Sequence, residues 1–311
     1  MSIVFFGTPS FAVPSLDALI GSGEEIAAVV TQPDKKKGRG HLLSIPPVKE
    51  LAVNKNIKVL QPESMKDKSF LEELSLIKPE LIVVVAYGRI LPESILKLPP
   101  RGCINVHASL LPKYRGAAPI QWAIINGEEF TGITTMLMDK GLDTGDILLQ
   151  EEINISHEDT AETLGSKLSE LGASLLVKTI KGIKGGSIKP RPQTGEASYA
   201  PVIRKEDGLV DWTKSAVDLF NFVRGMYPWP CAYCYLNKER IKIIKAEALD
   251  GEGKPGRIER AQKDGLIIGT GKGLISITAL QPEGKKVMPA EAFLHGRNIK
   301  EGTYFDGKQM D

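Results

Sequence analysis

Apolar, β-branched runs alternate with segments of helical period through the first half of the chain. Strands are expected at residues 3–6, 26–31, 81–86, 104–106, 132–138 and 147–155, and helices at 11–20, 70–77 and 160–181. Strands that alternate with helices in this way are typical of βαβ units around a parallel sheet. The first half is therefore predicted to be an α/β domain with a Rossmann-like, mostly parallel sheet.

The pattern changes after residue 182, where Gly, Lys and Pro replace the apolar runs. Residues 182–193 read GIKGGSIKPRPQ, a composition typical of a linker. One helix is expected at 215–226, and short strands at 232–236, 241–246, 256–261, 266–269 and 274–279. Such a series of short strands predicts a small OB-like β-barrel. We expect the α/β domain at 1–189, a linker at 190–206 and the barrel domain at 207–311.

Composition places the chain among ordinary globular proteins, with 42% apolar and 25% charged residues. The longest uncharged apolar run, residues 81–86, is too short to cross a bilayer, and no signal-peptide pattern follows the first methionine. Three cysteines are too few for a disulfide framework and fit a reducing compartment. We expect a cytoplasmic monomer without a membrane segment. Because the net charge is only +2, any attraction to nucleic acid must come from local clusters of basic residues.

Candidate chemistry is concentrated where the strand at 104–106 ends. Asn105 and His107 are two residues apart, so their side chains share one face of the strand, at the sheet edge where ligands bind. An Asn amide can donate to an oxyanion and an imidazole can carry a proton near neutral pH. Asp143 or Asp146, after another strand, is a candidate to orient the imidazole. A turn-capping Asn, a buried structural His and an ordinary Asp-rich turn are the alternatives.

Longer motifs around these residues point to a known family. The stretch NVHASLLPKYRGAAP at 105–119, with GLDTGDI at 141–147, resembles the 10-formyltetrahydrofolate-dependent formyltransferases. The likeness includes FGTP at 6–9, TQPD at 31–34 and GRG at 38–40, and runs nearly end to end. Within this family, the chain looks most like the members that formylate methionyl-tRNA. The resemblance implies that the domain at 1–189 is catalytic and that the domain at 207–311 positions the tRNA. The family fold that it implies, a Rossmann-like domain and an OB-like barrel, agrees with the periodicity.

The resemblance implies a reaction and the residues that serve it. The expected activity is transfer of a formyl group from 10-formyltetrahydrofolate to the amino group of methionyl initiator tRNA, for translation initiation. Asn105, His107 and Asp143 are the implied catalytic residues. Asn105 and protonated His107 would stabilise the oxyanion, and Asp143 would hold the imidazole and help relay a proton towards folate N10. The implied folate-binding residues are Ser109, Leu110, Leu111, Pro112, Arg89, Ile90 and Leu91.

A basic segment, DKKKGRGH at 34–41, lies between a predicted strand end and the next helix. Its cations suit a loop that grips phosphates, although a solvated surface loop has the same composition. The resemblance favours initiator tRNA as the partner of Lys35, Lys36, Lys37, Arg39 and His41. A second basic group near the linker could track the acceptor stem or simply keep the connection soluble: Lys181, Lys184, Lys189, Arg191, Arg204 and Lys205.

No metal is expected, because the formyl group is already activated on N10 and the four histidines show no ligand spacing. A dinucleotide is not expected either, since no Gly-x-Gly-x-x-Gly follows the first strand. Cys231 and Cys234 form a Cys-x-x-Cys pair that lacks the partners of a zinc site and the setting of a redox motif. We interpret this pair as structural.

Three rival functions share parts of the pattern. The same chemistry could act on a small amine, such as a glycinamide ribonucleotide or an amino sugar nucleotide, but that acceptor would not need the basic segment or the barrel. A hydrolase would use water to release formate from the folate. A nucleic-acid-binding module on an inactive Rossmann-like scaffold would not need Asn105, His107 and Asp143 together.

Overall fold

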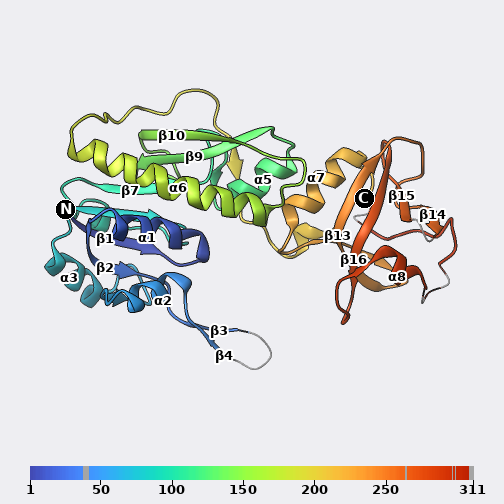
Figure 1. Ribbon diagram of the computed structural model, residues 1–311, viewed down its shortest axis with the longest axis horizontal. Helices are drawn as coiled ribbons and strands as arrows, with labels where there is room; N and C mark the ends of the chain where they lie inside the picture. The colour runs from blue at the N-terminus through green and yellow to red at the C-terminus, as the bar shows by residue number, and fades with distance from the viewer. Residues whose placement is uncertain (38–41, 263–264, 296, 298, 308–311) are drawn as a thin grey trace. The chain divides into compact units, whose positions relative to one another are not determined.

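The computed structural model describes residues 1–37, 42–262, 265–295, 297 and 299–307 (Figure 1). The chain forms two compact units. The first unit comprises Met1–Pro119, Phe130–Asn154 and Gly165–Ala200, and the second comprises Ile120–Glu129, Ile155–Leu164 and Pro201–Asp311. Residues 120–129 and 155–164 lie inside the predicted domain 1–189 but group with the C-terminal part of the chain. The periodicity of the sequence does not indicate this feature. The predicted domain limits at 189 and 206 stay a prediction.

A seven-stranded sheet in the order β10-β9-β7-β6-β1-β2-β5 forms the centre of the first unit (Figure 1). Its strands are β1 (Ser2–Gly7), β2 (Glu25–Val30), β5 (Val59–Leu60), β6 (Leu81–Val85), β7 (Cys103–His107), β9 (Phe130–Leu137) and β10 (Ile147–Asn154). The pairs from β5 to β7 are parallel, whereas β9 and β10 add an antiparallel edge. All five residues of β6 are buried, as expected of a strand inside a parallel sheet.

Helices and short strands complete the first unit. The helices are η1 (Ser10–Ala12), α1 (Val13–Gly21), α2 (Pro47–Asn54), α3 (Lys68–Ile77), α4 (Glu93–Leu96) and most of α6 (Ala161–Lys184). Two small sheets pair β3 (Lys35–Lys37) with β4 (Leu42–Ser44) and β8 (Arg115–Gly116) with β11 (Tyr199–Ala200). The β8–β11 pair brings residues 199–200, inside the predicted linker, to the segment that follows β7.

The second unit is an antiparallel sheet in the order β12-β13-β16-β15-β14, with β17 beside β16. Its elements are α5 (Pro119–Ile125, from residue 120), η2 (Glu206–Gly208), α7 (Ala216–Met226), β12 (Ala232–Leu236), β13 (Glu239–Leu249), β14 (Ile258–Gln262), β15 (Gly265–Gly269), β16 (Leu274–Pro282), β17 (Met288–Pro289) and α8 (Ala290–His295). Bridges from Tyr304 to Arg257, beside β14, and from Asp306 to Tyr235, in β12, join the two edges. The sheet therefore closes into a small barrel around one apolar core.

The predicted fold class is confirmed: a mostly parallel α/β sheet precedes an antiparallel β domain. One local expectation was wrong, because the flanks of the basic segment 34–41 are not loop but the antiparallel hairpin β3–β4, which projects from the first unit (Figure 1). Among the described residues, no helix combines the length and apolar character needed to cross a membrane.

Candidate active site

Asn105, His107 and Asp143 meet at one edge of the sheet in the first unit. Asn105 and His107 project from β7, and Asp143 lies in the loop between β9 and β10. Asn105 Nδ2 lies 3.3 Å from Asp143 Oδ1, and His107 Nδ1 lies 3.7 Å from Asp143 Oδ2. The structure thus brings the three predicted catalytic residues together, and of the two candidate carboxylates it is Asp143 that faces the imidazole.

Asp143 adopts a left-handed backbone conformation with φ 52°. This conformation is unfavourable for a residue with a Cβ, so surrounding contacts must fix it. Gly116 N–H donates to Asp143 Oδ2 at 2.9 Å, and Gly145 lets the loop press against β9, where any Cβ would overlap the Leu137 carbonyl. The carboxylate of Asp143 is therefore held by the Gly116 N–H and the Asn105 amide, on a loop that packs closely against β9.

The hydrogen bonds of His107 define its tautomer. Its Nε2 lies 2.9 Å from the Tyr114 carbonyl oxygen, which can only accept, so Nε2 carries the hydrogen. Nδ1 faces Asp143 Oδ2 at a distance beyond a good hydrogen bond. A second proton on Nδ1 would point at this carboxylate or at an oxygen placed beside it. The side chain of His107 is 6% exposed, so such a charge would act in a site with little water.

The predicted folate residues 109–112 form the turn that leaves β7. Ser109 is fully buried and its hydroxyl donates to the Lys113 carbonyl at 2.6 Å. Thr134 on β9 connects two of these residues, since its hydroxyl donates to the Ser109 carbonyl and accepts from Leu111 N–H. Leu110 and Pro112 are partly exposed, so this rigid turn keeps apolar surface at the same edge as the catalytic residues.

The second predicted folate stretch, 89–91, follows β6. Arg89 is turned towards neighbouring backbone, because its guanidinium donates to the carbonyls of Pro62 and Glu63 at 3.0 and 2.9 Å. Ile90 is 85% exposed and Leu91 is buried in the core. Ile90 is therefore exposed apolar surface beside an ordered arginine.

The predicted tRNA residues are only partly described. Arg39 and His41 lie outside the described residues, and only the backbone of Lys36 and Lys37 belongs to them, in β3. The ammonium of Lys35 donates to Gln32 Oε1 at 3.0 Å. In the basic group near the linker, Lys184 pairs with Glu24 and Arg191 donates to Gln150, both within the first unit.

The base of the β3–β4 hairpin is a polar network. Asp34 accepts from Lys49 at 2.7 Å and from Gln61 at 2.8 Å, and these two hydrogen bonds, that of Gln61 foremost, lower the pKa of the Asp34 carboxyl. Gln32 donates to the carbonyl of Tyr87 at 2.9 Å. The hairpin is therefore fastened to the loop that precedes the predicted folate residues 89–91.

The cysteines are buried thiols. Burial raises the pKa of Cys103 to about 12 and also raises the pKa values of Cys231 and Cys234. Raised thiol pKa values disfavour the thiolate that metal binding and redox exchange require. Within the described residues, no group of three or more His, Cys, Asp or Glu side chains is arranged to hold a metal ion.

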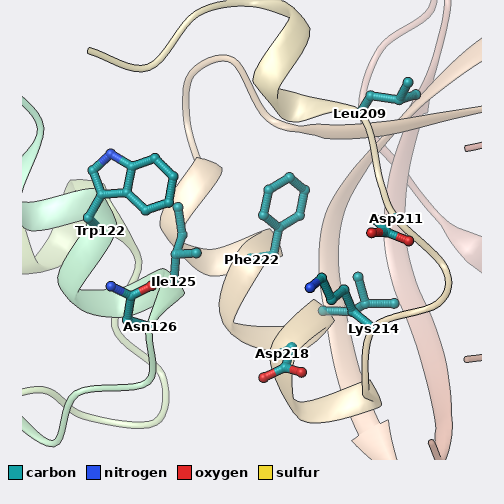
Figure 2. A pocket seen from close by; sticks show the side chains of 9 residues that line it. Trp122, Ile125, Asn126, Leu209, Asp211, Lys214, Asp218 and Phe222 are labelled. Atoms are coloured by element: carbon teal, nitrogen blue, oxygen red, sulfur yellow. The ribbon is translucent and has the colours of Figure 1, made fainter. Parts of the chain in front are cut away.

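A cavity of about 630 Å³ lies in the second unit, between α5 and α7 (Figure 2). Its apolar lining includes Trp122, Ile125 and Phe222, and its polar lining includes Asp211 and Asp218. Both carboxylates already cap local structure, Asp211 by accepting from Thr213 and Asp218 in the capping box of α7. None of the candidate catalytic residues lines this cavity.

Sequence reasoning missed three polar residues that build the site. Gln193 donates to the carbonyls of Asp143 and Gly145, Gln150 donates to the Leu111 carbonyl, and Thr134 joins Ser109 to Leu111. Their partners are mostly backbone groups of distant segments, which leave no spacing pattern in the sequence. The position of Gln193 at the end of a segment poor in core residues instead suggested a linker.

Comparisons with known proteins agree with this architecture. A family model described as "Formyl transferase" matches residues 1–180, and one described as "Formyl transferase, C-terminal domain" matches residues 202–298. The "Methionyl-tRNA formyltransferase" of Thermodesulfovibrio yellowstonii is 59% identical over 300 residues, which are 96% of this chain and 97% of that protein.

Two solved structures support the fold alone, since both are distant in sequence. HypX from Aquifex aeolicus, in complex with tetrahydrofolic acid, has a TM-score of 0.63 at 18% identity over 99% of this chain. The match covers 50% of HypX, so this chain spans about half the length of that protein. An N-formyltransferase from Helicobacter canadensis, in complex with folinic acid and dTDP-3-aminofucose, has a TM-score of 0.66 at 22% identity, covering 88% of this chain and 98% of that chain.

Proposed function

The chain belongs to the formyltransferase family, and from that premise we propose that it formylates methionyl initiator tRNA. The formyl donor is 10-formyltetrahydrofolate, and the products are N-formylmethionyl-tRNA and tetrahydrofolate for translation initiation. The observation that carries this proposal is the 59% identity, over nearly the full length of both chains, to a protein named for this activity. Formylation of a small amine or hydrolysis of the folate has no comparable support.

Asn105, His107 and Asp143 are the proposed catalytic residues. The neutral amine attacks the formyl carbon, a C–N bond forms, and the oxygen of the tetrahedral intermediate carries negative charge. One N–H of the Asn105 amide faces Asp143, which leaves the second for this oxyanion. His107 contributes a positive charge and a proton on Nδ1, the ring nitrogen that has no close hydrogen bond.

Collapse of the intermediate breaks the bond between the formyl carbon and folate N10. The proton that the amine loses must reach N10, and we assign its relay to Asp143 with the imidazole of His107. The Asp143 carboxylate suits this task because it lies within reach of both other residues and is 13% exposed in its side chain. It also stabilises the imidazolium that forms while the oxyanion exists.

The folate is proposed to lie along Ser109, Leu110, Leu111 and Pro112 and to cover Arg89, Ile90 and Leu91. The support is the ordered turn at 109–112 and the exposed side chain of Ile90. The proposed tRNA contacts are those of the basic segment, Lys35, Lys36, Lys37, Arg39 and His41, whose flanks form a hairpin. We further propose that the protein acts as a cytoplasmic monomer and without a metal.

The experiment that tests the function is formyl transfer from 10-formyltetrahydrofolate to methionyl initiator tRNA. Elongator methionyl-tRNA and unacylated methionine serve as alternative acceptors, and Asn105→Ala serves as the catalytic variant. Initiator-selective activity that the variant lacks is the expected result. Folate consumption without tRNA formylation would contradict the proposed acceptor and indicate a small amine or water.

A further inference from the structure

We propose that Gln193 is a positioning residue of the formyl-transfer site, which fixes the loop that carries Asp143. This inference rests on the proposed function, because it gives Gln193 a part in catalysis only if Asp143 has one. Gln193 comes from the segment that leads from α6 to β11, well apart in sequence from both β7 and the loop after β9.

The amide of Gln193 binds the backbone of the Asp143 loop at two points. Its Nε2 donates to the Asp143 carbonyl and to the Gly145 carbonyl, each at 2.8 Å. These two hydrogen bonds use both hydrogens of the amide and span the residues on which the left-handed conformation of Asp143 depends. Without them, Asp143 would be free to relax towards a more favourable φ and to turn its carboxylate away from His107.

Arg115 sets the orientation of the Gln193 amide. Its Nε and one terminal nitrogen donate to Gln193 Oε1 at 3.1 and 2.6 Å, so the oxygen of the amide faces Arg115 and the nitrogen faces the Asp143 loop. The next residue, Gly116, donates its N–H to Asp143 Oδ2. Arg115, Gly116, Gln193 and Asp143 are therefore linked in a closed ring, in which Gln193 holds the backbone of Asp143 and Gly116 holds its carboxylate.

The ring also includes the residue that fixes His107. Tyr114, whose carbonyl accepts from His107 Nε2, directly precedes Arg115, and its own N–H donates to Ser198 in the same segment as Gln193. Residues 191–200 thus hold the partners of both His107 and Asp143. Small displacements of catalytic groups cost large factors in rate, so the predicted effect of losing Gln193 is on kcat and not on substrate binding.

The test compares Gln193→Ala with Gln193→Glu in the full-length protein, by steady-state formylation of methionyl initiator tRNA. Both variants should lower kcat by about tenfold to about 100-fold and leave both KM values within about twofold. Glutamate keeps the size of the side chain and the contact with Arg115, but it places an oxygen against two carbonyl oxygens. Gln193→Glu should therefore be at least as harmful as Gln193→Ala, whereas a packing role would make it the milder change.

Gln281→Ala is the matched control, because Gln281 also donates to a carbonyl, that of Lys285, but lies in the barrel. Its kcat should equal that of the wild type. Thermal unfolding, followed by circular dichroism, gives the folded fraction to which every kcat is referred. An unchanged kcat for Gln193→Ala, a milder effect of Gln193→Glu, or a loss of kcat that equals the loss of folded protein would each overturn the proposal.

The proposed function fails in a different way. If the wild type formylates no tRNA, or if Asn105→Ala is as active as the wild type, the assigned reaction or site is wrong whatever Gln193 does. If the wild type is active and Asn105→Ala is not, the two Gln193 variants test the positioning role alone.

Discussion

The surroundings of Asn105, His107 and Asp143 in the first unit and the barrel of the second unit are stabilised by different kinds of interaction. Around the catalytic residues, polar side chains fix loops by hydrogen bonds to backbone groups 48 to 84 residues away, as between Gln193 and the Gly145 carbonyl or between Ser198 and the Tyr114 N–H. In the barrel, β12 and β16 bury alternate apolar residues against one core. This difference predicts that a single polar substitution around the catalytic residues lowers kcat. A substitution that loosens the second unit should instead lower the free energy of unfolding.

The largest expected effect is that of Asp143→Asn on kcat. Asparagine keeps the shape and one acceptor for the Gly116 N–H, but it removes the charge beside His107. We expect kcat to fall by about 10³- to 10⁴-fold, as when a carboxylate that orients a catalytic histidine is neutralised, with little change in the melting temperature. Steady-state kinetics and circular dichroism measure both quantities.

Asp146→Asn is the matched control for that experiment. Asp146 is the other acidic candidate of the same loop, but Asp143 is the residue that faces the imidazole. The control should keep kcat within about tenfold of the wild type. A larger loss for Asp146→Asn than for Asp143→Asn would contradict the assignment of the carboxylate.

Next in size is the loss of stability expected of Arg224→Met in the second unit. The Arg224 guanidinium donates to the carbonyls of Ser156 and Asp159 and stacks 4.6 Å above the Phe220 ring. Burial lowers the pKa of Arg224, and the nearby charge of Asp159 opposes that effect. Methionine retains the packing but removes the hydrogen bonds that the guanidinium donates to Ser156, Asp159 and Asn221, so the free energy of unfolding should fall by about 3 kcal/mol.

Tryptophan fluorescence during urea unfolding is a selective measurement of this effect. The three tryptophans, Trp122, Trp212 and Trp229, all belong to the second unit, so the signal follows that unit alone. Arg240→Ala is the control, since its pairing with Glu283 at 3.4 Å is long and partly exposed, and is worth no more than about 1 kcal/mol. If Arg224→Met lowers kcat per folded molecule, substitutions in the second unit affect catalysis as well as stability, which would contradict the distinction between the two units.

The same distinction explains which features the sequence predicted. Alternating or continuous apolar runs predicted the strands β6 and β12 nearly to the residue, because burial imposes a period on neighbouring positions. The period of two also placed Asn105 and His107 on one face. Gln193 was missed because its partners are carbonyl oxygens of residues 48 and 50 positions away, and every residue has a carbonyl. The β3–β4 hairpin was missed because Lys-rich strands lack the apolar period.

A smaller effect is expected of the basic segment, through binding and not through the chemical step. Replacing Lys36 and Arg39 together by alanine should raise the KM for methionyl initiator tRNA by about tenfold and flatten its dependence on salt, because two phosphate contacts are lost. The KM for the folate should not change. Lys66→Ala with Lys68→Ala removes two exposed cations elsewhere in the first unit and is the control. Equal tRNA KM values in the two double variants would refute the role of the segment.

The smallest expected effect is that of Tyr87→Phe on the free energy of unfolding. It tests whether a polar group of the first unit stabilises the fold only when it has a hydrogen-bond partner. The Tyr87 hydroxyl is buried and finds no hydrogen-bond partner among the described residues, while its ring packs edge-on against Phe6. Tyr87→Phe keeps the ring and removes the unpaired group. The free energy of unfolding, measured by urea and circular dichroism, should rise by about 1 kcal/mol at neutral pH.

Alkaline pH should widen this difference, because burial raises the pKa of Tyr87 to about 12, against an ordinary value of 10.0. A raised pKa favours the protonated phenol in the folded protein, so its contribution is complete below pH 10 and is lost as the pH rises towards 12. The wild type should therefore lose stability above pH 10 faster than Tyr87→Phe does. If the variant is instead less stable at neutral pH, the hydroxyl has a partner, and the first unit depends on polar pairing even inside its apolar core.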